Sequence, residues 1–386
     1  RNDIEGYEPT DIYQLELSTN NIIKDDFING SLLSDFPFKI INFDANLDGK
    51  DDIIVFNTGK DADEFPGAYN DFLFNNGNEL EILSEQIPNQ KGFSHGGAVE
   101  DVNNDGFIDI LFHEHGGQAE PTLLINNADN TFSNRKDLLP SEYAYETWNW
   151  ATYLEPNRYI LADQSFVGTN FLTAEYADVN GDDWIDILAA GQQNYAFGPK
   201  DLYPRIYLND GDGSFLNNER VLLGESFFGE FGGWNGAIIG EDLDGDGFDE
   251  IITSSGLMGG YENTNSIMEY SSQYWKTANG IDFDEVSNLF FDGFNSYSSV
   301  YEYHLLDFNF DGYWDISTDI MIDDNTADYT PLVWINAGDG SFYKIDNDIF
   351  GLFNGFGRFF EDENGFYSRV GFTTVNTVNS DDNTLT

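Results

Sequence analysis

The sequence contains no cysteine and has few basic residues. Its 386 residues include 16 Lys and Arg against 70 Asp and Glu, which gives a formal net charge of −54. Because recognition of phosphates depends on Lys and Arg, we expect no nucleic-acid partner, and the same acidity opposes docking on anionic membranes. An exported chain without disulfides needs another kind of cross-link, and ions bound to its loops can serve as one.

Long apolar runs are absent as well. No stretch reaches the roughly 18–20 residues of a membrane-spanning helix, so we expect no membrane insertion. Hydrophobic patterns of helical period are nearly absent along the chain. The sequence starts at Arg1 with no visible signal peptide, from which we expect a mature protein or a piece of a larger secreted or surface protein.

One acidic pattern recurs five times along the chain, at spacings of 57, 77, 64 and 65 residues. Each copy has Asp at its first position, Asn or Asp at the third, Asp at the fifth and Asp or Glu at the ninth. Oxygen atoms at alternate positions of a tight turn converge on one hard cation, and calcium takes six to eight such ligands in flexible geometry. We therefore predict about five calcium ions, one per copy. The predicted metal ligands are Asp44, Asn46, Asp48 and Asp52; Asp101, Asn103, Asp105 and Asp109; Asp178, Asn180, Asp182 and Asp186; Asp242, Asp244, Asp246 and Glu250; and Asp307, Asn309, Asp311 and Asp315.

The residues after each copy distinguish the pattern from an EF-hand loop. An EF-hand has a bidentate Glu at its twelfth position and continues into a helix. The twelfth positions here are Val55, Phe112, Ala189, Thr253 and Thr318. Short apolar runs rich in β-branched residues occupy these segments, which predicts that each loop joins two buried strands. The alternative is that the acidic turns are solvated hairpin tips without a metal.

A second pattern of Asn, Asp and Gly accompanies the first, most clearly at 126–132, 209–215 and 336–342. Such residues between apolar runs are typical of β-hairpins. Each unit therefore reads as strand, acidic loop, strand, variable loop, strand, hairpin and strand. Four strands in about 55–65 residues, repeated along the chain, predict the blades of a β-propeller.

Together these two motifs resemble the FG-GAP and VCBS repeat families, and Phe231-Gly232-Gly233 before Asp242 is similar to the aromatic–glycine start of such repeats. The resemblance covers essentially the whole chain. It implies a calcium-binding β-propeller, but it implies no particular activity, because this fold serves many unrelated functions.

The number of units predicts an all-β fold with a single β-propeller domain over 1–386. We expect six four-stranded blades, with the ring closed by N- and C-terminal strands that share one blade. An insertion at 133–172 separates the second and third blades, and seven blades are the alternative if that insertion holds one more. The expected blades are 36–83, 93–135, 172–222, 236–286, 299–346, and 355–386 joined with 1–30.

The variable loops are expected on the face of the ring opposite the acidic loops, and ligands are commonly bound by such loops. The strand ends of the second expected blade bring His95, His113 and His115 to that face. The crossover that follows adds four candidate catalytic residues and several aromatic residues. The catalytic candidates are His95, His113, His115, Tyr143, Tyr145, Arg135 and Arg158, and the candidate ligand-binding aromatics are Trp148, Trp150, Tyr153, Tyr195 and Trp234.

Four interpretations of this face compete. The aromatic residues bind a glycan or an extracellular protein; a His–Tyr–Arg group performs β-elimination on a uronate polysaccharide; His95, His113 and His115 hold zinc; or these side chains only pack between blades. The loops also resemble those of a rhamnogalacturonan-degrading lyase family. No nucleophile elbow, zinc-protease motif or phosphate loop is present.

We therefore favour a recognition or adhesion module over an enzyme, with a polysaccharide lyase as the alternative. Weak calcium sites of this kind fill only at high-micromolar to millimolar calcium, which predicts an extracellular or cell-surface location.

Overall fold

The structure is a computed structural model that describes residues 13–16, 21–24, 28–29, 37–59, 67–77, 79–84, 87–88, 91–92, 94, 96–113, 121–140, 143, 171–191, 204–216, 221–224, 232–234, 237–257, 270–287, 299–309, 311–323, 328–344, 358–360, 367–370, 378–379 and 384–385. Across these residues the chain is built from short β-strands and one 3₁₀ turn, η1 (Lys136–Leu138). Among them there is no helix with the length and apolar character needed to cross a bilayer.

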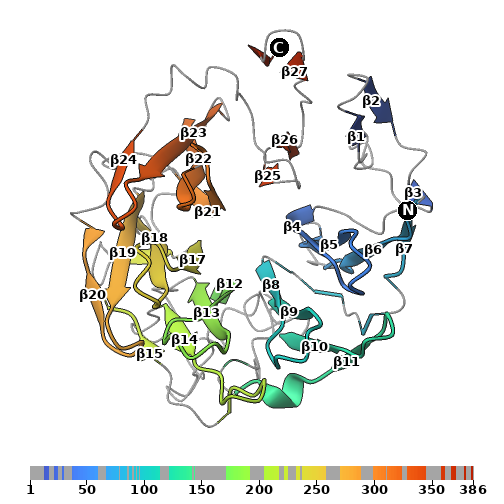
Figure 1. The fold of residues 1–386 in the computed structure, drawn as a ribbon, viewed down its shortest axis with the longest axis horizontal. Coiled ribbons are helices and arrows are strands. Elements are labelled where there is room, and N and C mark those ends of the chain that lie inside the picture. The colour runs from blue at the N-terminus through green and yellow to red at the C-terminus, as the bar shows by residue number, and fades with distance from the viewer. Residues whose placement is uncertain are drawn as a thin grey trace, which may run out of the picture.

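Five antiparallel blades of four strands stand around a central axis (Figure 1). Their innermost strands face the axis, and successive strands lie farther outward. Blade 4 has its inner edge divided between two short strands, β16 and β17, which both pair with β18. Blade 1 comprises β4 (Pro37–Phe43), β5 (Asp52–Asn57), β6 (Asp71–Asn75) and β7 (Leu80–Ile82); blade 2 comprises β8 (Gly96–Glu100), β9 (Asp109–His113), β10 (Thr122–Asn126) and β11 (Phe132–Asn134). Blade 3 comprises β12 (Phe171–Ala177), β13 (Asp186–Gly191), β14 (Arg205–Tyr207) and β15 (Val221–Leu222); blade 4 comprises β16 (Gly232–Trp234), β17 (Ile238–Glu241), β18 (Glu250–Leu257), β19 (Tyr270–Thr277) and β20 (Phe283–Glu285). Blade 5 comprises β21 (Ser299–Leu306), β22 (Asp315–Asp323), β23 (Asp328–Asn336) and β24 (Phe342–Lys344).

The predicted all-β propeller is confirmed, but the prediction of six blades, with seven as the alternative, is wrong. The terminal strands do not join into one closing blade. They form three separate two-stranded sheets, and one short strand, β3 (Ile28–Asn29), instead pairs in parallel with β7 at the outer edge of blade 1. The three pairs are β1 (Tyr13–Glu16) with β2 (Asn21–Lys24), β25 (Arg358–Phe360) with β26 (Tyr367–Val370), and β27 (Val378–Asn379) with β28 (Thr384–Leu385).

The physical reason for the missing sixth blade lies in the acidic loops. In the five blades, an acid at the ninth loop position accepts a backbone N–H from its own loop, and in four of them a second one from the blade's hairpin. The segment between β25 and β26 has no acid in that register. Among the described residues, nothing of this kind ties a C-terminal strand pair to an N-terminal one, and two- to four-residue strands are too short to specify the pairing by themselves.

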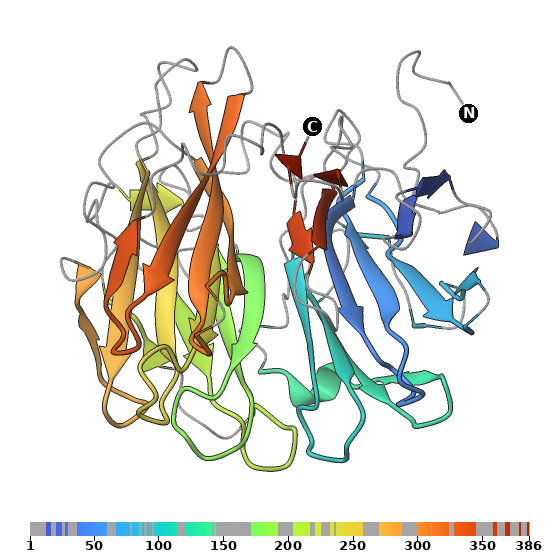
Figure 2. The same ribbon diagram turned by 45° about the horizontal axis from the view of Figure 1, so that its top comes forward.

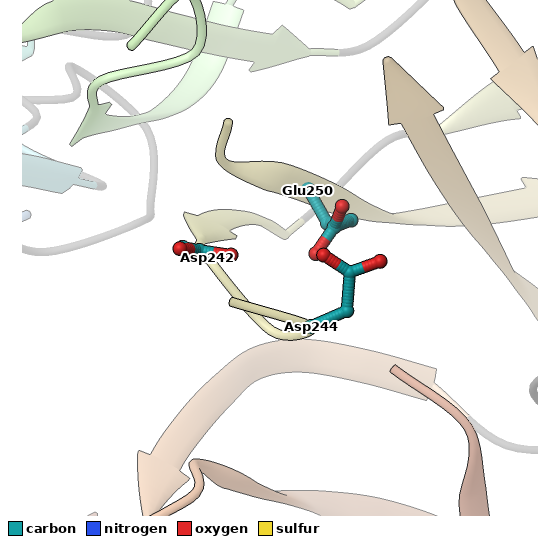
Figure 3. Close-up of side chains that lie close together, drawn as sticks. All are labelled: Asp242, Asp244 and Glu250. Carbon is teal, nitrogen blue, oxygen red and sulfur yellow. The ribbon is translucent and has the colours of Figure 1, made fainter. Parts of the chain in front are cut away.

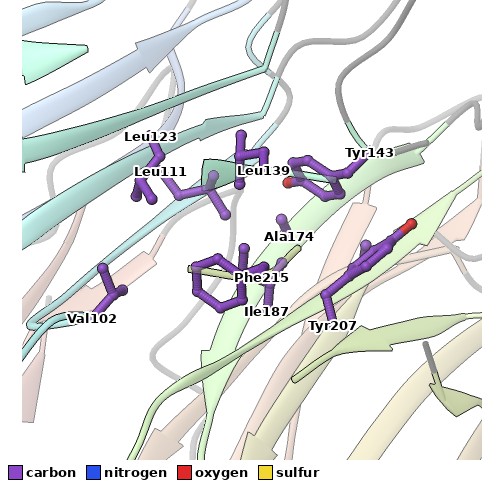
Figure 4. Close-up of a cluster of buried hydrophobic side chains, with 10 residues drawn as sticks. Val102, Leu111, Leu123, Leu139, Tyr143, Ala174, Ile187, Tyr207 and Phe215 are labelled. Carbon is purple, nitrogen blue, oxygen red and sulfur yellow. The ribbon is translucent and has the colours of Figure 1, made fainter. Parts of the chain in front are cut away.

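The hydrophobic core is divided among the joints between neighbouring blades. Because blades 2 and 3 have a neighbouring blade on both faces, their second strands are buried along their whole length, as in Asp109–His113 and Asp186–Gly191. Four joints separate consecutive blades from blade 1 to blade 5, and one cluster of buried side chains fills each joint. Figure 4 shows the cluster between blades 2 and 3, where Leu111 and Leu123 face Ile187 and Tyr207. Each fully buried side chain of this size contributes about 1.5–3 kcal/mol to the ring.

The acidic loops and the outer hairpins lie at one end of the ring. The loops join the first and second strands of each blade at 44–52, 101–109, 178–186, 242–250 and 307–315, and are called loops 1 to 5 below. Figure 2 shows them at the lower end of the blades, beside the hairpins between the third and fourth strands. The expected strand–loop–strand arrangement is therefore confirmed, and it brings the candidate metal ligands to one face.

Candidate metal centre

The first Asp of each loop fixes the turn through its two carboxylate oxygens. In loop 2, Asp101 Oδ1 accepts the N–H of Asp105 at 3.0 Å, and Oδ2 accepts the N–H of Gly106 at 2.6 Å. The same pair of bonds is present in the other four loops, at 2.7–3.1 Å. The turn requires a positive φ at its sixth position, which is 91° at Gly106. Glycine adopts this conformation without a steric cost, and loop 3 places Asp183 there instead, at φ 65°.

The side chains at the third and fifth positions lie over the same turn. Asn103 Oδ1 accepts the N–H of Asp105 at 2.9 Å, and Asp105 Oδ1 accepts the N–H of Phe107 at 3.0 Å. The corresponding bonds recur in all five loops, at 2.9–3.2 Å. The repeated sequence pattern therefore produces one repeated geometry, in which oxygen atoms from three alternate positions gather on one side of a loop.

The ninth acid has a different environment, because its side chain is fully buried in every blade. Asp186 is representative: Oδ2 accepts the N–H of Val179 at 3.3 Å, and Oδ1 accepts the N–H of Asn209 at 2.8 Å. Val179 belongs to the loop and Asn209 to the hairpin of the same blade. The carboxylate thus holds the acidic loop against the hairpin, a role that the sequence pattern did not reveal.

Burial raises the pKa of these ninth acids above the ordinary value for a carboxyl group. The pKa is raised to about 6 for Asp52, about 7 for Asp109, and about 8 for Asp186 and for Glu250. In Asp52, Asp109 and Asp186 the backbone N–H bonds act in the opposite direction, whereas the nearby loop acids add to the increase. In Glu250, Lys276 is the main opposing influence. A divalent cation in the loop would favour the ionised form of each group.

Loop 4 brings three acids close enough to share one ion. Carboxylate oxygens of Asp242, Asp244 and Glu250 all lie within 4.8 Å of one another (Figure 3). Glu250 Oε2 accepts the N–H of Leu243 at 2.9 Å, whereas Oε1 is buried and has no hydrogen-bond partner among the described residues. A buried carboxylate oxygen without a donor is unfavourable, and a bound cation would satisfy it.

A lysine also reaches this group. The Nζ atom of Lys276 donates to Asp244 Oδ2 and lies 3.9 Å from Glu250 Oε1. Burial lowers the pKa of Lys276, but the hydrogen bond to Asp244 and the charge of Glu250 outweigh that effect, and the net pKa is raised. Lys276 therefore carries its positive charge inside loop 4.

The donor sets of the loops fit calcium. They consist of carboxylate and amide oxygens, which are the ligands that hard cations prefer, and they include no thiolate or imidazole. The side chains that would hold an ion are those at the first, third, fifth and ninth positions.

An asparagine in the hairpins of blades 2, 3 and 5 links the acidic loops of adjacent blades. In blade 2, Asn126 Nδ2 donates to Ala45 O of loop 1 at 2.8 Å and to Ile108 O of its own loop at 3.1 Å. Asn209 and Asn336 make equivalent bonds to loops 2 and 4. These residues begin the hairpin pattern visible in the sequence, but their role across the blade joint was missed.

Loops 3 and 4 are connected without such an asparagine, because Thr277 occupies that position in blade 4. Instead, Asp249 Oδ2 accepts the N–H of Asp178 at 2.7 Å, and the N–H of Asp249 donates to Asp178 O at 3.3 Å. The acidic loops from 1 to 5 thus form a connected series on one face of the ring.

The candidate residues on the opposite face are described only in part. His113 is buried, with Nδ1 3.2 Å from the hydroxyl oxygen of Tyr143, and Tyr143 packs within the core cluster of Figure 4. Arg135 is exposed and pairs with Asp137 at 3.0 Å. His95, His115, Tyr145, Trp148, Trp150, Tyr153, Arg158 and Tyr195 lie outside the described residues, as does the side chain of Trp234. The predicted pocket, the zinc site among the three histidines and the catalytic roles therefore stay predictions.

Comparison with protein families supports the repeat that was inferred from the loop motif. Residues 178–253 match the family model of the FG-GAP-like repeat. This segment contains loops 3 and 4, so the resemblance inferred from the loop motif is confirmed there. No match to a curated protein was found.

Among solved structures, the chain is similar to the periplasmic gluconolactonase PpgL of Pseudomonas aeruginosa, with 11% identity, a TM-score of 0.42, and coverage of 87% of this chain and 77% of that one. It is also similar to the exo-β-1,3-galactanase 1,3Gal43A of Clostridium thermocellum, with 9% identity, a TM-score of 0.40, and coverage of 81% and 64%. At these identities and TM-scores, the likeness says nothing about the activity of this chain.

Proposed function

We propose that the protein is a calcium-stabilised β-propeller that serves as an extracellular recognition module. Calcium ions in the acidic loops stiffen one face of the ring, and the opposite face binds a glycan or an extracellular protein. The observation that carries the calcium proposal is the identical bonding of the first Asp in all five loops. Its support is the close group of Asp242, Asp244 and Glu250 in loop 4, where the buried Oε1 of Glu250 accepts no hydrogen bond among the described residues.

The recognition role is supported by what surrounds the candidate catalytic residues. A general base for β-elimination must reach its substrate, but His113 and Tyr143 are both buried and contact each other. This packing favours a binding module over a polysaccharide lyase. The net charge of −54 fits surroundings rich in salt and calcium, where charge repulsion is screened.

Titration calorimetry on the chelator-treated protein tests the calcium proposal. We expect several calcium ions to bind per chain and the melting temperature to rise, because an ion that binds only the folded state stabilises it by about 2.7 kcal/mol at one hundred times its Kd. Asp101→Ala in loop 2 should remove one ion. Asp129→Ala removes the same charge from an exposed hairpin position outside the loops and should leave the number of ions unchanged. Absence of calcium binding would contradict the proposal.

The recognition role is tested by binding of the calcium-loaded protein to arrays of glycans and of extracellular proteins. We expect binding that disappears when a chelator removes the calcium. Silence on both arrays would count against a recognition module. Formation of unsaturated uronates from an acidic polysaccharide would establish the lyase instead.

A further inference from the structure

Loop 4 differs from the other four loops in its charges. Its third position is Asp244, where loops 1, 2, 3 and 5 have asparagine, and its ninth position is Glu250, where the others have aspartate. Loop 4 therefore carries four carboxylates at the ligand positions, and each other loop carries three. Without compensation, this extra charge would make loop 4 the most attractive site for a divalent cation.

A basic residue provides that compensation. Lys276 precedes Thr277 at the end of β19, and the residues at the same place in blades 1, 2, 3 and 5 are all apolar: Phe74, Ile125, Leu208 and Ile335. The only blade with a fourth carboxylate at its ligand positions is thus the blade that has a lysine at this place. Its ammonium group restores the net charge of the ligand set to that of the other loops.

The geometry places the ammonium group among the candidate ligands. Lys276 Nζ donates to Asp244 Oδ2 and lies 3.9 Å from Glu250 Oε1, which accepts no hydrogen bond among the described residues. It also lies 5.9 Å from the ring centroid of Tyr274, which favours a cation. A divalent ion bound by Asp244 and Glu250 would have to displace this group from Asp244 or share the oxygen with it.

The hairpin of blade 5 covers this pair closely. Gly340 has φ 71°, and a Cβ atom there would lie 2.8 Å from Asp244 Cβ and 3.1 Å from Lys276 Nζ. The side chains of Lys276 and Asp244 are 27% and 16% exposed, so the contact is part of a packed joint between blades. Such an ion pair is held more firmly than a more exposed one, such as that of Lys50 with Asp48 Oδ2 in loop 1 at 2.9 Å, where the side chains are 41% and 31% exposed.

We propose that Lys276 acts as a built-in cation of loop 4, so that this loop binds a divalent ion more weakly than the other four. The inference rests on the proposed calcium binding and extends it to the ranking of the sites. Blade 4 then keeps its loop ordered at calcium concentrations that leave the other loops empty.

Calorimetric titration of the intact chain with calcium, and a parallel titration with terbium followed by sensitised luminescence, test the proposal. In the native chain we expect four tight ions and a fifth that is at least about tenfold weaker, which corresponds to about 1.4 kcal/mol. Lys276→Met should convert the weak site into one at least as tight as the other four, so that five tight ions bind. Lys344→Met removes the same charge from an exposed position on β24 and should change neither the number of ions nor their ranking.

Variants of the loops themselves give a second measurement if Lys276→Met folds poorly. Asp182→Asn and Asp246→Asn change the exposed fifth positions of loops 3 and 4. We expect Asp182→Asn to remove one tight ion and Asp246→Asn to remove none. Loss of a tight ion in Asp246→Asn, or five equal sites in the native chain, would overturn the role of Lys276 while leaving the calcium proposal intact. Absence of ion binding in every variant would instead contradict calcium binding itself.

Discussion

At the scale of single residues, the acids of one loop divide into two kinds. Asp182 is exposed and bonds within its own loop, whereas Asp186 is buried and accepts N–H groups from the loop and from the hairpin. Both residues are aspartates in the same nine-residue pattern, so the motif predicts where they are but not what each one supports. The distinction depends on burial, which arises only when the loop packs against the rest of the blade.

Replacing these two acids should separate folding from metal binding. Asp186→Ala leaves the N–H groups of Val179 and Asn209 without acceptors in a buried site, and we expect the free energy of unfolding to fall by at least about 2 kcal/mol. Asp182→Ala should change it by less than about 0.5 kcal/mol in chelator but weaken calcium binding. Urea denaturation in chelator measures the free energy of unfolding of each variant. Equal losses in the two variants would refute the division of roles.

At the scale of elements, the ring is linked blade to blade by hairpin asparagines. Asn126 reaches from blade 2 to loop 1, and Asn336 reaches from blade 5 to loop 4. In blade 1 the corresponding Asn75 donates to Asp51 O of its own loop, and the described residues contain no bond from it to another blade. The series of links therefore starts at blade 1, in agreement with five blades and no closing sixth.

The pair Asn126 and Asn127 allows this link to be tested at adjacent positions. Asn126 is buried and crosses the joint, whereas Asn127 is exposed and bonds to Thr131 within its hairpin. We expect Asn126→Ala to lower the free energy of unfolding by about 1–3 kcal/mol, because it removes one hydrogen bond to a buried carbonyl group and one to a half-buried carbonyl group. Asn127→Ala should have an effect within about 0.5 kcal/mol. Hydrogen exchange in loop 1 should also accelerate in Asn126→Ala alone.

At the scale of the whole molecule, the repeat was predicted correctly from the sequence, whereas the predicted closure of the ring by a shared terminal blade was wrong. The loop motif identified five strand–loop–strand units, since each unit is specified by residues close together in the chain. Closure depends on pairing between segments near the two ends, and strands such as Thr384–Leu385 are too short to show a periodic pattern. Similarly, the sequence placed His113 at a strand end on the face opposite the acidic loops, but it did not show that Tyr143, from the connection between blades 2 and 3, contacts it there.

The whole molecule should also respond to pH in a way that depends on calcium. Without calcium, the pKa of Asp109 is about 7 and that of Asp186 about 8 in the folded chain, against ordinary values near 4 in the unfolded chain. Between these values the folded chain binds more protons than the unfolded one, so its stability rises as the pH falls from 8 to 6. The net charge of −54 acts in the same direction, because protonation reduces self-repulsion.

Calcium should cancel or reverse that trend, since a bound cation favours the ionised carboxylates and competes with protons. We therefore expect the melting temperature in chelator to be higher at pH 6 than at pH 8, and the melting temperature in millimolar calcium to be equal at the two values or higher at pH 8. Calorimetric scans at both pH values, with and without calcium, measure the four temperatures. A rise in stability from pH 6 to pH 8 in chelator would mean that the buried carboxylates are stabilised in their ionised form by the N–H groups alone. In that case the need for a cation would be confined to Glu250, whose Oε1 lacks such a donor.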